Sequence, residues 1–274
     1  MEYKEVENWQ HKKELIGLLD VTTAPKHLYA MGTWDPTLFE NCAAIVGSRN
    51  ITSYGQTVVE KLIPKLVSEG VTIISGFMYG VDQHAHLACI DAGGKTIAVL
   101  GWGITTKLSG NDLKLANRIV ESGGLLLSEW EDQKAAHWTF PARNRIVAAL
   151  SKDVYVVEAA LQSGSLITAR LAQKLKRQLW AVPGPITSRT SLGTNKLIAE
   201  GKARMWLGDE PLSKRTTKTD DPILQALDSE PLTADEIALK LSLPVSHVGA
   251  TLSMMLISGQ ILQKGGTYYI AHAR

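Results

Sequence analysis

The chain has 274 residues and a net charge of +2, and its 45% apolar and 20% charged residues exclude wholesale disorder. No apolar run approaches the about 20 residues that span a bilayer, and the charged first thirty residues contain no signal-peptide core, so we expect a soluble cytoplasmic protein without a membrane partner. Two cysteines, Cys42 and Cys89, are too few for a disulfide framework or a four-cysteine zinc site.

The first forty residues carry no strong periodic pattern, and we expect a short N-terminal extension over 1–40. Beyond it, short apolar runs alternate with helical patterns. The apolar runs lie at 43–46, 71–74, 96–100, 125–127, 154–157 and 179–182. The helical patterns lie at 55–68, 81–92, 113–122, 144–150, 166–177 and 194–200. Such alternation is typical of parallel strands covered by helices on both faces. Residues 41–210 therefore predict an α/β domain with an extended Rossmann-like, doubly wound, mainly parallel sheet.

The C-terminal part of the chain predicts a second, smaller domain. Residues 211–221 are polar and bounded by prolines, as in linkers. Residues 222–274 then contain a short helix at 223–227, helices at 233–241 and 245–258, and a hairpin at 261–270, which together indicate a winged helix. Because the helix over 245–258 contains no Lys or Arg, we expect this domain to contact protein rather than DNA.

Basic side chains are concentrated in one part of the chain. Residues 139–204 carry eleven Lys and Arg against three Asp and Glu, whereas residues 1–138 carry 12 against 16. A segment of this kind either meets an anionic partner or forms a solvated helix face.

Small residues follow most of the predicted strands, at the edge where open α/β sheets bind ligands. Gly47, Ser48 and Arg49 follow the first strand, and Tyr54 lies where the next helix begins. A glycine turn that leads into a helix N-terminus favours phosphate. Neither a G-x-G-x-x-G fingerprint after a strand nor a G-x-x-x-x-G-K-[ST] loop occurs, which disfavours dinucleotide and P-loop sites.

Residues 140–145 read FPARNR, with Trp138 two residues earlier. Single-stranded nucleic acid requires cations for its phosphates and flat apolar faces for its bases, and this segment offers both. The alternative is that Phe140 and Trp138 are core residues and that the arginines pair with acidic side chains. The segment SGSLIT at 163–168 forms another small-residue loop that could cradle a phosphate.

Metal binding and catalysis have weaker support. Asp82, His86 and Cys89 share roughly one face of a helix, as metal ligands can, but a packed helix with one hydrogen-bonded histidine is the better explanation. Glu129 and Glu158 end strands and could act as acid or base, or pair with arginines. No G-x-S-x-G elbow or H-E-x-x-H helix is present.

Taken in order, these segments resemble the DNA-processing protein A family (DprA, also called Smf). The matching segments are AIVGSRNITSYG at 44–55, SGFMYGVDQHAH at 75–86, GKTIAVLGWG at 94–103, GGLLLSEW at 123–130, FPARNRIVAALS at 140–151, VVEAALQSGSLITARLA at 156–172 and AVPGPITSRTSLGTNKLIAEGKA at 181–203. The resemblance implies a non-enzymatic protein without cofactor or metal. It also implies binding of single-stranded DNA without sequence preference, dimerisation, and loading of the RecA recombinase during natural transformation in competent cells.

The family's motifs, together with the residues around them, give an expected DNA site. It consists of Gly47, Ser48, Arg49, Tyr54, Ser75, Gly76, His86, His137, Phe140, Arg143, Asn144, Arg145, Ser163, Gly164, Ser165 and Thr168, with Lys152 or Lys174 as further phosphate contacts.

The chain departs from the family where Ile104 and Thr105 stand in the loop that usually carries Tyr-Pro. The alternative function is that of a nucleotide N-glycosidase of the lysine-decarboxylase-related group, whose P-G-G-x-G-T-x-x-E motif is only half present at 122–129.

Overall fold

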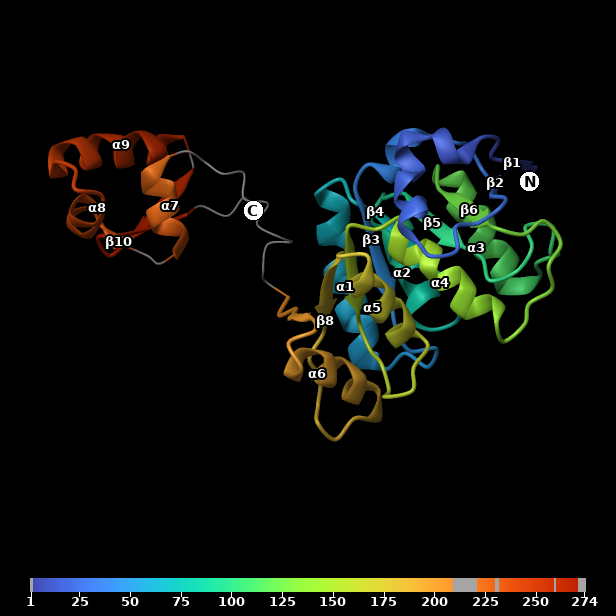
Figure 1. Cartoon of the computed structure of the whole chain (residues 1–274). Coiled ribbons are helices and arrows are strands. Elements are labelled where there is room, and N and C mark those ends of the chain that lie inside the picture. Colours follow the sequence, from blue (N-terminus) through green and yellow to red (C-terminus); the bar gives the residue numbers. More distant parts are fainter. Residues whose placement is uncertain (1, 209–220, 230–231, 259, 271–274) are drawn as a thin grey trace. The chain divides into compact units, whose positions relative to one another are not determined.

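The structure is a computed structural model that describes residues 2–208, 221–229, 232–258 and 260–270. The chain forms two compact units, residues 1–208 and 209–274 (Figure 1). The expected linker, 211–221, lies outside the described residues except for Asp221. None of the described helices is long and apolar enough to cross a membrane.

A nine-stranded sheet in the order β1-β2-β6-β5-β4-β3-β7-β8-β9 forms the centre of the first unit. Its parallel strands are β3 (Cys42–Val46), β4 (Thr72–Ser75), β5 (Thr96–Val99), β6 (Leu125–Ser128), β7 (Asp153–Val156), β8 (Gln178–Ala181) and β9 (Arg204–Met205). Counted from β3, the strands β4, β5 and β6 follow on one side of the sheet, and β7, β8 and β9 follow on the other. The strand order therefore reverses between β3 and β7, which is where open α/β sheets bind ligands. The expected fold class is confirmed.

The N-terminal forty residues belong to this first unit. They provide β1 (Tyr3–Glu5) and β2 (Tyr29–Met31), and β2 pairs antiparallel with both β1 and β6. Between them run the 3₁₀ segments η1 (Trp9–His11) and η2 (Lys13–Asp20), and η3 (Pro36–Phe39) follows β2. The side chains of Leu15 and Leu18 are fully buried, so these residues extend the sheet and its core.

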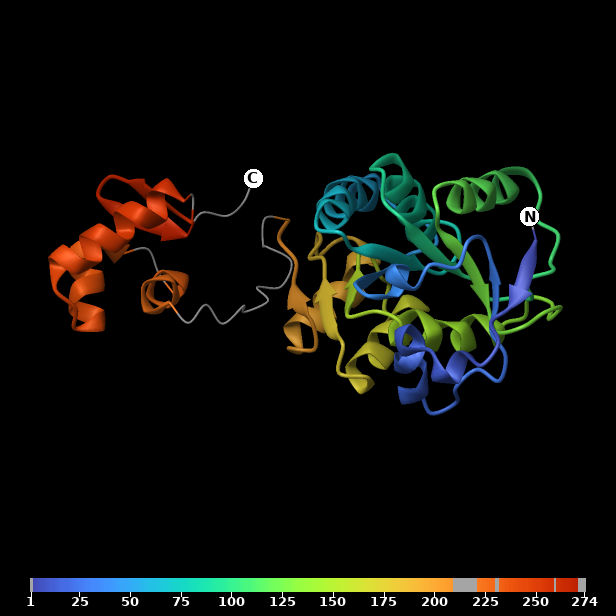
Figure 2. The ribbon, with the colours of Figure 1, turned by 90° about the horizontal axis from the view of Figure 1, so that it is seen from above.

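Helices cover both faces of the sheet (Figure 2). The helices are α1 (Ser53–Ser68), α2 (Val81–Asp91) and α3 (Gly110–Glu121) on one face, and α4 (Thr139–Ala149) and α5 (Ser165–Lys174) on the other, beside η2. Alternate residues of each strand point to opposite faces. Ile97 and Val99 accordingly pack with α4 and η2 in one cluster, and Ala98 packs with α3 in another. Helix α4 begins five residues earlier than the sequence predicts. After β8 come η4 (Arg189–Ser191) and α6 (Leu192–Ala199).

The second unit contains the elements expected of a winged helix. They are α7 (Pro222–Ser229), β10 (Leu232–Thr233), α8 (Ala234–Leu241), α9 (Val245–Ile257), β11 (Ile261–Lys264) and β12 (Thr267–Ile270). The three strands form an antiparallel sheet in the order β10-β12-β11. Thr233 and Glu236 form a reciprocal capping box at the start of α8. Ile237, Val248 and Leu252 are fully buried in the core of this unit.

Candidate functional site

A cleft of about 590 Å³ lies at the carboxyl ends of the parallel strands, where the strand order reverses. The loops after β3, β4, β7 and β8 and the start of α4 form its walls. The expected site residues that line it are Gly47, Ser48, Arg49, Gly76, His137, Phe140, Arg143, Asn144, Ser163, Gly164, Ser165 and Thr168. Segments that lie as far apart as residues 47 and 168 in the sequence therefore meet in one place.

The turn after β3 is built by close approach of two loops. A Cβ on Gly47 would lie 2.5 Å from a methyl group of Val81, and a Cβ on Gly80, whose φ is +81°, would collide with the Ser48 carbonyl. The Ser48 hydroxyl accepts a hydrogen bond from the Asn50 amide (3.1 Å) and donates one to the Asn50 carbonyl (2.9 Å). The turn is thus fixed by its own contacts, and it presents an exposed residue, Arg49, to the cleft.

Arg49 and Phe140 form a pair within the cleft. The guanidinium carbon of Arg49 lies 5.2 Å from the centre of the Phe140 ring, within the range of a cation–π contact. The ring of Phe140 in turn packs on the backbone of Gly101, where a Cβ would come within 2.7 Å, and edge-on against Trp102. The half-buried ring therefore rests on the loop after β5 and supports the guanidinium above it.

Glu158 ties the loops after β3, β7 and β8 together. Its buried carboxylate accepts hydrogen bonds from the amide and hydroxyl of Thr52 (2.9 and 2.6 Å) and from the hydroxyl of Thr190 (3.1 Å). The Thr52 hydroxyl also caps α1 by accepting from the Gly55 amide. This carboxylate, considered above as an acid or base, has a structural role in these contacts.

Arg143 forms the floor of the cleft. Only 3% of it is exposed, its Nη1 donates to the Val99 carbonyl (2.5 Å), and a Cβ on Gly76 would collide with the guanidinium. Burial lowers the pKa of Arg143 to about 10, and the neighbouring carboxylate of Asp82 partly offsets this effect. Burial likewise raises the pKa of Asp82, against the charge of Arg143. Arg143 therefore remains a cation at neutral pH, but it is held against the backbone rather than extended into solvent.

Arg145 lies outside the cleft. Its Nη1 and Nη2 donate to the two carboxylate oxygens of Glu129 (2.6 and 2.5 Å), and its Nε donates to the Thr23 carbonyl (2.6 Å). The side chains of Arg145 and Glu129 are only 12% and 9% exposed. Two positions apart on a helix, Arg143 and Arg145 face different directions. The expected pairing of arginine with a strand-end carboxylate thus applies to Arg145, whose donors are not available to a phosphate in the cleft.

His86 is also separate from the cleft. It is fully buried on α2, and its Nδ1 shares a hydrogen bond with the Thr96 hydroxyl (2.7 Å). Burial, followed by the charge of Arg143, lowers the pKa of His86 to about 3, so the ring is neutral. Within the part of the chain that the structure describes, no group of three or more His, Cys, Asp or Glu side chains is arranged to hold a metal ion.

Two further expected residues support the strand ends without lining the cleft. The hydroxyl of Ser75 is buried and donates to the Ile45 carbonyl (2.5 Å). The hydroxyl of Tyr54 donates to the Pro183 carbonyl (2.6 Å) and so links α1 to the loop after β8.

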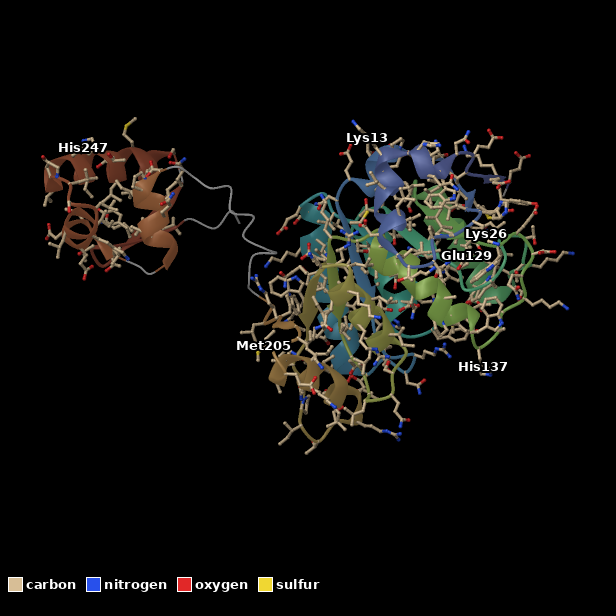
Figure 3. All side chains as sticks on the ribbon, viewed as in Figure 1. Lys13, Lys26, Glu129, His137, Met205 and His247 are labelled. Atoms are coloured by element: carbon tan, nitrogen blue, oxygen red, sulfur yellow. The ribbon has the colours of Figure 1, made fainter. Side chains whose placement is uncertain are left out.

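The loop before α5 forms the opposite wall. The hydroxyls of Ser163 and Ser165 share a hydrogen bond (2.8 Å), and the Asn144 side chain contacts the Gly164 carbonyl at 3.4 Å. The N-terminus of α5, the positive end of its dipole, faces the cleft at Ser165 and Thr168. Lys152 precedes β7 and Lys174 ends α5, so these two lysines lie toward the other edge of the sheet. Figure 3 shows His137 projecting at the periphery of the first unit.

Sequence reasoning missed Arg189. This exposed residue begins η4 and lines the cleft from the β8 side. The available signal was its position in the loop between the last predicted strand and the last helix, because that loop reaches the same edge of the sheet.

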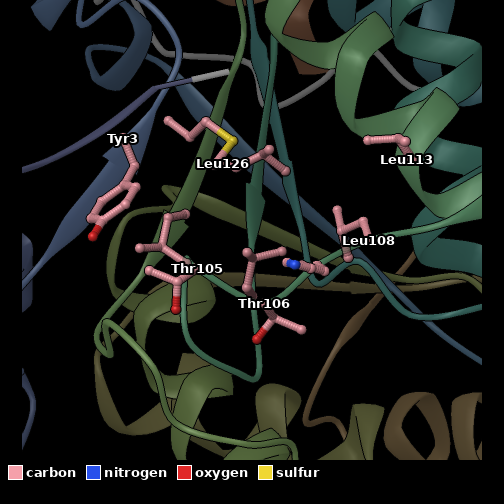
Figure 4. Close-up of a pocket in the computed structure, with 10 residues that line it drawn as sticks. Tyr3, Thr105, Thr106, Leu108, Leu113 and Leu126 are labelled. Atoms are coloured by element: carbon pink, nitrogen blue, oxygen red, sulfur yellow. The ribbon is translucent and has the colours of Figure 1, made fainter.

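A second pocket, of about 440 Å³, differs in chemistry from the cleft (Figure 4). Its walls are mainly apolar side chains, among them Leu108, Leu113 and Leu126, and Lys107 is its one charged lining residue. The cleft, by contrast, is lined by three arginines and one acidic residue. The cleft therefore offers more positive charge to an anionic ligand than the second pocket does.

Comparison with known proteins gives two family matches. The family described as DNA recombination-mediator protein A matches residues 7–216, and the DprA winged helix domain matches residues 209–267. Protein Smf of Escherichia coli K12 is 34% identical over 274 residues, covering 92% of this chain and 73% of its own length. The DNA processing protein DprA of Streptococcus pneumoniae is 38% identical over 198 residues, covering 72% of this chain and 69% of its own length.

Solved structures agree with these matches. The X-ray structure of DprA from Streptococcus pneumoniae has a TM-score of 0.67 and 35% identity, covering 75% of this chain and 71% of its own. DNA processing protein A from Helicobacter pylori, solved for its single-stranded DNA binding mode, has a TM-score of 0.65 and 34% identity. It covers 75% of this chain and 91% of its own.

Proposed function

The chain belongs to the DNA recombination-mediator protein A family, and from this premise we propose that it binds single-stranded DNA in the cleft, whatever the base sequence. The observation that carries the proposal is the exposed guanidinium of Arg49, held over Phe140 in a cleft at the strand-order reversal. A guanidinium offers N–H donors to a phosphate along its edge and a flat surface to a base on its face.

The surroundings of Arg49 support an anionic, flexible ligand. The N-terminus of α5 directs its positive dipole end into the cleft, and Arg143 adds a permanent cation at the floor. Stacking does not depend on the identity of the base, because every base has a π-face. These features account for binding without sequence preference.

We further propose that the protein, when bound to single-stranded DNA, acts as a recombination mediator. In this role a homodimer carries the DNA strand in the cytoplasm and loads the RecA recombinase during natural transformation, without a cofactor or a catalytic step. The winged helix, whose α9 contains no Lys or Arg, contacts protein rather than DNA. The N-glycosidase alternative would use Glu129 or Glu158, but Arg145 binds the first, and Thr52 and Thr190 bind the second.

Fluorescence anisotropy with labelled oligonucleotides tests the proposal. We expect binding to thymine, adenine and mixed single strands alike, and weaker binding to duplex. If about four phosphates are held, affinity falls roughly fiftyfold between 50 and 200 mM salt. Arg49→Ala should weaken binding, whereas Arg170→Ala, which removes an exposed arginine of α5 outside the cleft, should not. Affinity that does not change with salt would contradict the proposal, as would release of free base from AMP.

A further inference from the structure

Arg189 is an exposed cation on a fixed piece of backbone. It begins η4, whose turn is closed by hydrogen bonds from the Ser188 amide to the Pro185 carbonyl and from the Ser191 amide to the Ser188 carbonyl (2.9 and 3.1 Å). Thr190 anchors the turn to the loop after β7, because its carbonyl accepts from the Ala159 amide (2.6 Å). The position from which the arginine extends is therefore defined by the fold.

The guanidinium of Arg189 has no acidic partner among the described residues: none of the ion pairs within 4 Å there includes it. The carboxylate that the neighbouring Thr190 contacts, that of Glu158, is already bound by hydroxyl and amide donors. An exposed, uncompensated arginine that lines a cleft is available to an anionic ligand.

Arg49 and Arg189 line the cleft from the ends of two strands that are not neighbours. Arg49 follows β3 and Arg189 precedes the helix after β8, and β7 lies between these strands. With about 4.8 Å between neighbouring strands, the two strand ends are about 10 Å apart. The Arg49 guanidinium also leans away from β8, because it rests on Phe140, which packs against the loop after β5.

We propose that Arg189 binds a second phosphate of the same DNA strand, different from the phosphate bound by Arg49. The inference rests on the proposed function and deepens it. Two cations that hold different phosphates bind neighbouring parts of a polynucleotide and leave a mononucleotide with only one of them. The site therefore selects a chain over its monomers, and the bound strand crosses the sheet edge from the loop after β5 toward the loop after β8.

The test is a double-mutant cycle on single-strand affinity, with thymine oligonucleotides as the probe. A single-strand phosphate contact contributes a salt slope of about 0.7, so Arg189→Ala should weaken binding about eightfold at 50 mM salt and about threefold at 200 mM. If the two arginines hold different phosphates, the fold-losses of Arg49→Ala and Arg189→Ala multiply in the double variant. Arg170→Ala is the matched control, and Arg189→Lys should retain the slope.

The outcomes separate the two proposals. If the unaltered protein does not bind single strands, the proposed function fails. If it binds and Arg49→Ala weakens it, while Arg189→Ala matches the Arg170→Ala control, the inference about Arg189 is overturned. If the double variant bound single strands as tightly as the weaker-binding of the two single variants, the two arginines would share one phosphate. That result would also overturn the inference about Arg189. Thymidine monophosphate should compete at least tenfold less well than a short thymine oligonucleotide, and equal competition would count against selection of a chain.

Discussion

Replacement of Arg145 by alanine separates a stabilising role of this arginine from a DNA-binding role. Arg145 makes a two-point ion pair with Glu129 and donates to the carbonyls of Thr23 and Ala142. Both charged side chains are about nine-tenths buried. Removal of one partner leaves the other charge buried without compensation, which costs about 3–5 kcal/mol of unfolding free energy. We therefore expect Arg145→Ala to destabilise the first unit strongly.

Tryptophan fluorescence is the suitable assay. All seven tryptophans of the chain lie within residues 1–208, so the signal reports unfolding of the first unit and not of the winged helix. For a unit of this size, each kcal/mol shifts the midpoint temperature by about 2–4 °C. The variant should melt about 6–20 °C below the unaltered protein.

A paired replacement provides the control. Arg145→Met combined with Glu129→Leu removes both charges and keeps most of the apolar volume, so it should recover much of the lost stability. Measured where each variant is folded, single-strand affinity should stay within about twofold of the unaltered protein. An Arg145→Ala variant that melts normally but no longer binds DNA would refute this reasoning and assign the arginine to the site.

Two further predictions concern His86 and the winged helix. Because burial lowers the pKa of His86 to about 3, the folded state stays unprotonated where the unfolded state, with a pKa near 6.5, takes up a proton. The contribution of this residue to the free energy of unfolding is complete above pH 6.5 and is lost as the pH falls toward 3. The loss between pH 6.5 and 4.5 is about 2–3 kcal/mol. As the pH is lowered, the urea midpoint of His86→Asn should therefore fall less steeply than that of the unaltered protein. Parallel curves of midpoint against pH for the two proteins would disprove the assignment of this pH dependence to His86. A chain that ends at Gly208 should keep single-strand affinity within about threefold, and a large loss would give the winged helix a DNA contact.

The parallel core of the sheet was predictable because its signals are local. Strands buried on both faces need continuous apolar runs, and most of these runs end in small residues where the following loop turns. The antiparallel strands β1 and β2 lack this signal. Each has only three residues, and all three of β1, Tyr3–Glu5, are exposed. Their place in the sheet depends on pairing with β6, about one hundred residues away in the sequence.

The site was predictable as a place but not in its details. The glycine turn at Gly47 and the serine loop at Ser163 signal their positions at the strand ends, and the cleft joins them. The roles of the arginines depend on long-range partners instead. Arg143 is held by Val99, 44 residues earlier, whereas Arg145, besides its local bond to Ala142, has partners 16 and 122 residues away. These long-range partners are not visible in the FPARNR segment itself.

The arginines of this sheet edge therefore divide by where their counter-charges lie. Where a carboxylate of the chain fills the guanidinium fork, as Glu129 does for Arg145, the arginine stabilises the fold and adds little positive potential to the cleft. Where the fold leaves a guanidinium exposed, as for Arg49 and Arg189, its charge remains available to an external anion. The excess of basic residues over 139–204 thus overstates the charge that a ligand meets. The affinity for DNA should follow the exposed arginines of the cleft rather than the number of basic residues in the segment.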